Sequence, residues 1–200
     1  KPLTRFKDNR TSIKVSLKSY EPQESMLNGI YAFVKATWAD SPEELENATE
    51  EQKRDALDQM LSGKSLQLGL ETVNLRFLIS GINHIDAQQI TRQRIGVTFS
   101  AQCSGDRFLN HHDVMVEESI AQDPVLLEDF IGVSLAAKMS YARMVDSRKV
   151  SIQAARSVIP RNIDTFYNMG VNLSTILFFH QKRIENESQT WQLNEIAQQM

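Results

Sequence analysis

The stretch Val73–Arg94, VNLRFLISGINHIDAQQITRQR, changes its hydrophobic period once, and that change predicts a strand that leads directly into a helix. Val73–Ile79 alternates apolar residues with others, which is typical of a half-buried strand, and Ser80-Gly81 is expected to end it. Asn83 then offers a helix N-cap, and a short helix is predicted from about His84 to Arg94. The residues expected on its inner face are Ile85 and Ile90.

The rest of the chain mixes strands and helices without the regular alternation of a parallel βαβ fold, which indicates an α+β fold. We expect one domain over 1–200, in which 1–11 form a flexible or extended lead-in. The other predicted strands are Ser12–Tyr20 and Ile163–Val171. The other predicted helices are Glu24–Trp38, with Trp38 on its apolar face, two helices after the caps and capping boxes at Ser41 and Thr49, a helix from Asp123 to Asp146, one after the cap Ser151, one from the cap Asn172 to Arg183, and one from Ser188 to the end.

The longest predicted helix, from Asp123 to Asp146, has an apolar stripe that is typical of a core face or of a subunit interface. The polar segment before it, Leu109–Glu118, is expected to be a surface loop. Adjacent residues in that segment, His111-His112-Asp113, do not converge on one ion, so no metal site is predicted. The members of the stripe are Leu126, Phe130, Val133, Ala137, Ser140 and Met144.

The composition limits the class of protein. With 200 residues, of which 41% are hydrophobic, the chain can bury one globular core without disulfide or metal support. A formal charge of -3 and a pI near 5.8 argue against a dedicated nucleic-acid binder. The only cysteine is Cys103, which excludes an intramolecular disulfide and favours the reducing cytoplasm. No apolar run reaches the ~20 residues that span a bilayer.

A second stretch, Gln89–Phe108, QITRQRIGVTFSAQCSGDRF, gathers Arg92, Arg94 and Arg107 around small residues. Guanidinium groups have forked donors that suit phosphate and carbonyl oxygens, and small residues let a ligand approach the backbone. Gln89 and Arg92 are three residues apart and are expected to share a face of the predicted helix. The pattern indicates an anion site, although composition alone favours a solvated basic helix end followed by a polar loop.

Three segments together resemble the flavin-dependent thymidylate synthases, whose signature is RHRxxSxNxxSxR. The segments are Arg92-Gln93-Arg94 after a short helix, Ser104–Phe108 with the sequence SGDRF, and AARSVIPRN at 154–162 followed by a helix that ends at Arg183. The similarity extends from about Ser12 to the end of the chain. It implies an α+β protomer with a mixed or antiparallel sheet packed on long helices, and a homotetramer.

The resemblance also implies a role for each residue that matches a substrate contact of the family. Arg107 and Arg156 match residues that bind the phosphate of the nucleotide. Gln89, Arg92 and Arg183 match residues that hold the uracil, and Arg183 is the implied catalytic residue because the family needs that arginine for activity. The full set that matches substrate contacts is Gln89, Arg92, Ser104, Gly105, Arg107, Arg156 and Arg183.

The departures from the family pattern gather on the flavin side. Gln93 replaces the signature histidine, Gln102 replaces the signature asparagine, and Phe178 stands where the family has another asparagine. Three residues, Val97–Phe99, are extra, and the placement of this gap within 97–106 decides whether Ser104 or Gly105 faces the substrate. The residues that match flavin contacts are Gln93, Arg94, Gln102 and Asn172.

The implied reaction is the transfer of a one-carbon unit to C5 of deoxyuridine monophosphate (dUMP), with FAD as cofactor and with NADPH and methylenetetrahydrofolate as co-substrates. The expected partners are a deoxypyrimidine nucleotide and other copies of the chain, with no nucleic acid and no membrane. Two alternatives stay open. One is a diverged enzyme that adds a different group at C5, such as hydroxymethyl, with altered flavin use. The other is a relative that binds the nucleotide or assembles without catalysis.

Overall fold

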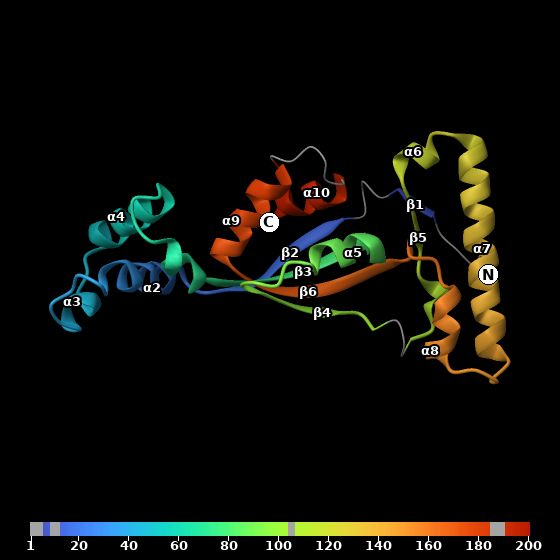
Figure 1. Ribbon diagram of the computed structural model, residues 1–200, viewed down its shortest axis with the longest axis horizontal. Helices are drawn as coiled ribbons and strands as arrows, with labels where there is room; N and C mark the ends of the chain where they lie inside the picture. Colours follow the sequence, from blue (N-terminus) through green and yellow to red (C-terminus); the bar gives the residue numbers. More distant parts are fainter. Residues whose placement is uncertain (1–5, 9–12, 104–106, 185–190) are drawn as a thin grey trace.

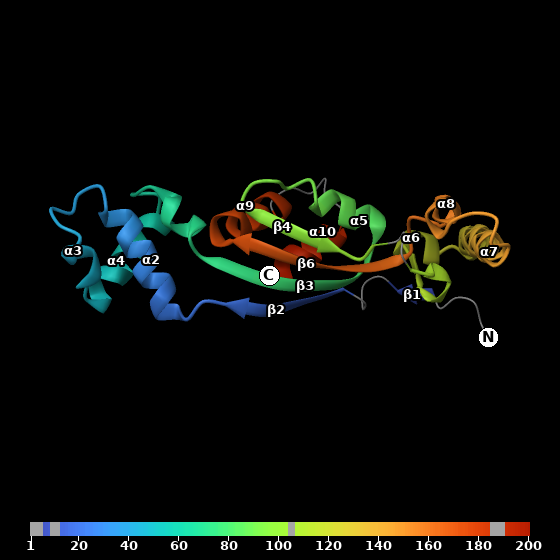
Figure 2. The same ribbon diagram turned by 90° about the horizontal axis from the view of Figure 1, so that it is seen from below.

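A computed structural model describes residues 6–8, 13–103, 107–184 and 191–200. Figures 1 and 2 show an elongated molecule in which a central sheet lies between two groups of helices. Within the described ranges, no helix is long and apolar enough to cross a membrane.

The central sheet has four antiparallel strands in the order β2-β3-β6-β4. Their bounds are β2 (Lys14–Tyr20), β3 (Asn74–Asn83), β6 (Asp164–Asn172) and β4 (Val97–Ala101). The antiparallel sheet and the α+β class predicted from the sequence are confirmed, whereas β4 was not foreseen as a strand.

The prediction that Ser80-Gly81 ends the strand was wrong, because β3 continues to Asn83. The pairing of β3 with β6 shifts by one residue between Ser80 and Ile82, and Gly81 lies there with a φ of 73°. A β-bulge of this kind lets the strand bend and continue instead of ending.

One face of the sheet packs against three helices, α5 (His84–Ile90), α9 (Leu173–Ile184) and α10 (Trp191–Gln199). The opposite face carries exposed side chains, among them Arg76 and Asn168. The buried sheet residues under the helices are Phe77, Ile79, Tyr167, Met169 and Val171.

Helix α5 begins as predicted and ends early. The Asn83 side chain accepts a hydrogen bond from the backbone N–H of Asp86 at 2.9 Å, which confirms the predicted cap. The helix ends at Ile90 instead of Arg94, because the chain must turn there to return as β4. Ile90 is buried as expected, but Ile85 is 46% exposed and points away from the core.

At one end of the sheet, α2 (Gln23–Lys35), α4 (Glu50–Leu61) and the 3-10 turn η1 (Gln67–Glu71) share a small core of their own. The short helix α3 (Glu43–Glu46) lies between α2 and α4 in the chain and buries no residue. The predicted capping box at Thr49 is present, since its side chain and that of Gln52 bond to each other's backbone N–H groups. Trp38, expected on the helical face, is 66% exposed because α2 ends before it.

At the other end, the long helix α7 (Pro124–Asp146) packs on β5 (Val114–Val116), which pairs in parallel with β1 (Phe6–Asp8). All of β5 is buried, so the prediction of a surface loop over Leu109–Glu118 was wrong there. The short elements η2 (Leu109–His111), α6 (Glu118–Ala121), α8 (Ile152–Ala155) and η3 (Arg156–Val158) complete this end.

The apolar stripe predicted for α7 faces the core of the chain only in part. Phe130 and Met144 pack against the core at this end of the molecule, whereas Leu126 is 51% and Val133 is 71% exposed. The buried residues of the helix are Ser134, Lys138 and Tyr141.

Hydrogen bonds hold the turn at Ile95-Gly96, just before β4, against the start of α9. The Asn172 side chain caps α9 by accepting from the N–H of Thr175 at 2.8 Å, as predicted, and the Asn172 N–H donates to the Gly96 carbonyl at 2.9 Å. The Thr175 hydroxyl donates to the Ile95 carbonyl at 3.1 Å. Gly96 has a φ of 65°, and a Cβ there would overlap the Thr175 hydroxyl and lie 2.6 Å from Asn172 Nδ2. Only glycine fits this turn without displacing the cap.

Replacing this glycine should therefore destabilise the protein more than replacing a glycine in open space. We expect Gly96→Ala to lower the free energy of unfolding by roughly 2–4 kcal/mol, because the left-handed backbone and the lost cap both contribute. Gly63 is the matched control, since its φ is 73° and a Cβ at that position would have no neighbouring atom within 4 Å. Gly63→Ala should cost about 1 kcal/mol from the backbone alone. Equal losses of unfolding free energy for the two variants, measured by urea unfolding, would contradict the steric conflict at Gly96.

Helix α5 also contains a buried acid, Asp86, whose side chain is 3% exposed. Burial, helped by the nearby Glu117 carboxylate, raises the pKa of Asp86 from 3.8 to about 7, and a hydrogen bond with Asn83 opposes the rise. A group with a raised acidic pKa is protonated in the folded protein at pH values where the unfolded chain is already ionised. Ionisation of the unfolded chain then favours unfolding as the pH rises.

We therefore expect the free energy of unfolding to fall by up to about 1.4 kcal/mol per pH unit between the two pKa values, from about 4 to about 7, and to level off above that range. Asp86→Asn should remove this slope and should be more stable than the wild type at alkaline pH. The exposed Asp40→Asn is the matched control and should keep the wild-type slope. Thermal unfolding across the pH range measures the effect, and identical slopes for the wild type and Asp86→Asn would refute it.

Candidate functional site

Two of the arginines predicted to bind substrate lie close together. Arg183, at the end of α9, is partly buried, and burial followed by the nearby Arg92 guanidinium lowers the pKa of Arg183. The Arg183 guanidinium carbon lies 5.3 Å from the centre of the Phe179 ring, which holds the side chain against α9. Two guanidinium groups that repel each other make a local positive field suited to an anion or to carbonyl oxygens.

Two of the residues predicted to contact the flavin, Gln93 and Asn172, line one hollow of about 400 Å³, which we call the amide hollow. Gln93 Nε2 donates to the Ile95 carbonyl at 3.3 Å, so its Oε1 is left as an acceptor. The Asn172 oxygen is used by the α9 cap, so its Nδ2 is left as a donor. Two more amides and an apolar side come from Gln67, Gln181, Ile95, Leu177 and Phe178.

Arg156 lies elsewhere, in a second hollow of about 350 Å³, which we call the arginine hollow. It shares this hollow with Arg161, Gln88 and His84. Burial and the neighbouring His112 lower the pKa of His84, against the effect of Asp164, so the imidazole is neutral at neutral pH. Sequence reasoning did not single out His84 or Arg161, although Arg161 belongs to the AARSVIPRN segment that carried the resemblance.

Among the predicted substrate residues that the structure describes, only Arg156 lines the arginine hollow, and none lines the amide hollow. Gln89 is partly buried on α5, while Arg94 and Arg107 are exposed. The Arg107 carbonyl accepts from the Tyr141 hydroxyl at 3.2 Å. Two predicted positions, Ser104 and Gly105, lie outside the described residues.

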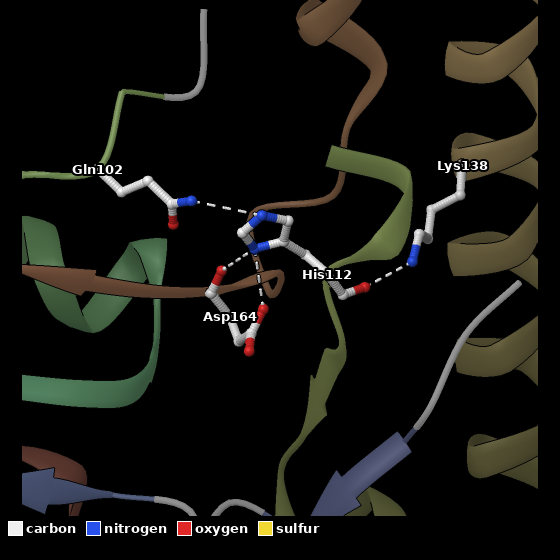
Figure 3. A network of polar contacts seen from close by, with 4 residues as sticks. All are labelled: Gln102, His112, Lys138 and Asp164. Atoms are coloured by element: carbon white, nitrogen blue, oxygen red, sulfur yellow. Dashed lines mark hydrogen bonds and ion pairs between the residues drawn. The ribbon is translucent and has the colours of Figure 1, made fainter. Parts of the chain in front are cut away.

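Gln102 joins a polar network that the sequence did not reveal (Figure 3). Its backbone N–H donates to the Phe166 carbonyl at 3.1 Å, and its Nε2 lies 3.4 Å from His112 Nε2. His112 Nδ1 lies 3.1 Å from the Asp164 carboxylate and 3.2 Å from the Asp164 carbonyl. The buried Lys138 donates to the His112 carbonyl at 2.6 Å. His112 was expected in a surface loop, yet it is partly buried between β6 and α7.

Side chains that bind metal ions do not gather into a site among the described residues. Over the residues that the structure describes, no group of three or more His, Cys, Asp or Glu side chains could hold an ion.

Comparisons with known proteins relate this chain to one family. The family model described as thymidylate synthase complementing protein matches residues 17–200. No curated protein matches the sequence.

Among solved structures, a UMP/dUMP methylase, PolB from Streptomyces cacaoi, bound with 5-Br UMP, is similar with a TM-score of 0.75 and 14% identity, over 100% of this chain and 90% of that chain. Thymidylate Synthase X (ThyX) from Helicobacter pylori, solved with FAD and dUMP, has a TM-score of 0.68 and 16% identity, over 94% and 90% of the two chains. These likenesses establish the fold. The family match confirms the resemblance drawn from the sequence, and the chain belongs to the thymidylate synthase complementing protein family.

Proposed function

We propose that the protein transfers a one-carbon unit to C5 of dUMP in a flavin-dependent reaction. The observation that carries the proposal is that Arg92 lies near enough to the partly buried Arg183 to lower its pKa, at two positions that the resemblance assigns to uracil contacts. Support also comes from two proteins of the same fold, which were solved with 5-Br UMP and with dUMP.

In this proposal the chain binds the nucleotide through its arginines. Arg92 and Arg183, with Gln89, donate to the uracil carbonyl oxygens and stabilise negative charge that develops there, and each well-placed donor is worth about 3 kcal/mol in the transition state. Arg156 in the arginine hollow and Arg107 bind the phosphate. No side chain is assigned as a nucleophile.

The amide hollow fits the ring of a flavin. Its side-chain amides offer both donors and acceptors, which match the alternating carbonyl and N–H groups of an isoalloxazine edge, and Phe178 with Leu177 offers an apolar wall. Gln93 and Asn172 would hold the ring edge, and Arg94 and Gln102 are the further proposed contacts. When bound and reduced, the flavin supplies a hydride, with NADPH and methylenetetrahydrofolate as the proposed co-substrates.

We further propose that several copies of the chain complete the site, as a homotetramer. Support comes from the amide hollow and the arginine hollow, which have no lining residue in common: Arg156 lines only the arginine hollow, and Arg183 lines neither. The part of the α7 stripe that the chain leaves exposed, with Leu126 and Val133, offers a surface for another copy.

Two alternatives are separable by the product. A relative that adds hydroxymethyl would give a product heavier than thymidylate by one oxygen, and a non-catalytic relative would bind nucleotide without turnover under any donor. The test incubates the protein with dUMP or UMP, FAD, NADPH and methylenetetrahydrofolate, and measures the product by mass spectrometry. Retained nucleotide binding without FAD binding would sink the flavin-dependent reaction.

The phosphate assignment is tested by removing Arg156. We expect Arg156→Ala to weaken dUMP binding by about 10- to 100-fold, because a charge-assisted hydrogen bond to phosphate is lost, while the melting temperature stays unchanged. Arg54→Ala on the distant helix α4 is the matched control and should bind dUMP as the wild type does. Calorimetry measures both affinities. Equal dUMP affinity for the two variants would refute the phosphate role.

A further inference from the structure

The contacts of His112 fix the position of its proton. His112 Nδ1 has two partners, the carboxylate and the backbone carbonyl of Asp164. A carbonyl oxygen and an ionised carboxylate accept hydrogen bonds and cannot donate them. Nδ1 must therefore carry the hydrogen. In the neutral imidazole, Nε2 is then left as an acceptor, and it accepts from Gln102 Nε2 at 3.4 Å.

The orientation of the Gln102 amide follows from this. While His112 is neutral, the NH2 group of Gln102 points to the ring and the carbonyl oxygen Oε1 is directed away from it (Figure 3). When His112 is protonated, Nε2 becomes a donor, and the amide must turn over to offer its oxygen. The protonation of one ring thus decides whether Gln102 presents an acceptor or a donor on its outer side.

Charged and titratable groups surround His112 on every element that packs against it. The hydrogen bond that His112 donates to the Asp164 carboxylate on β6 raises the pKa of His112, while burial and Lys138 on α7 oppose the rise. His84 on α5 is also close enough to interact, and Asp113 is the next residue in the chain. Asp164 is the direct partner among them, so it controls both the tautomer and the charge of the ring.

We propose that His112, oriented by Asp164, is a positioning residue that sets the Gln102 amide so that its oxygen faces a bound ligand and accepts from an imide N–H. The inference rests on the proposed function for its ligand, because an imide N–H between two carbonyl groups is common to uracil and to the flavin ring. While the His112 ring is neutral, Gln102 presents its oxygen and can accept from the imide N–H. When the ring is protonated, Gln102 presents its NH2 group, which cannot pair with the imide N–H.

The first test needs no ligand. In the free protein, the side-chain amide signals of Gln102 are followed by NMR from about pH 5 to pH 8, together with the His112 ring signals. We expect the two to share one midpoint. Asp164→Asn should move that midpoint to lower pH, because the loss of the carboxylate favours the neutral ring. A Gln102 amide that does not follow His112 would overturn the proposal.

The second test measures the affinity for dUMP and for FAD separately over the same pH range. For the ligand whose imide meets Gln102, we expect the ratio of wild-type to His112→Gln affinity to fall by about tenfold as His112 becomes protonated. The ratio removes the titration of the phosphate, which both proteins share. The exposed neighbour His111→Gln is the matched control and should keep the wild-type profile.

The outcomes distinguish the role proposed for His112 from the proposed function. A change of ratio for dUMP alone assigns the imide of uracil, and a change for FAD alone assigns that of the flavin. A flat ratio for both ligands, when both bind, would overturn the role of His112. Failure of both ligands to bind the wild type would instead sink the proposed function and the imide assignment, and the NMR titration would still decide whether His112 turns Gln102.

Discussion

The lock between the Gly96 turn and the first turn of α9 fixes the relation between the two halves of the candidate site. Asn172 ends β6, caps α9 and bonds to the Gly96 carbonyl, so one residue joins a strand, a helix and a turn. Because the turn is held there, Gln93 comes to the same hollow as Asn172. Helix α9 then starts in a fixed direction and returns Arg183 to the neighbourhood of Arg92.

Signals that act over a few residues could be predicted from the sequence. The caps at Thr49, Asn83, Ser151 and Asn172 were all found, because a cap side chain bonds to a backbone group two or three residues ahead. The predicted cap at Ser41 was wrong, since α3 begins after Pro42 without a side-chain cap. The short strands β4 and β5 were missed, since each is stabilised by a distant partner and has too few residues to reveal a period. The end of α5 was missed for a related reason, because the position of β4 determines it.

For the candidate site, only the family resemblance joined residues that are distant in the sequence. Gln93 and Asn172 line the same hollow although they are 79 positions apart by their numbers, 172 minus 93, and their contact with a flavin stays a prediction. His84, Arg161 and His112 carried no such signal. His112 reaches its partner Asp164 across 52 residues, and an isolated histidine in a polar segment does not reveal that partner. Burial and hydrogen bonding, which decide its role, are properties of the folded chain alone.

The departures from the family signature have a common physical character. On the flavin side, Gln93 and Gln102 are neutral amides where the signature has histidine and asparagine, and each uses its NH2 group on a protein acceptor. Each amide therefore leaves an oxygen for a ligand. The cationic groups, Arg92, Arg156 and Arg183, stand at the positions that the resemblance assigns to nucleotide contacts. Under the proposed function, charge recognises the phosphate and the uracil, whereas the flavin ring meets side-chain amides whose orientation depends on neighbouring protein groups, in a hollow that Glu71 also lines.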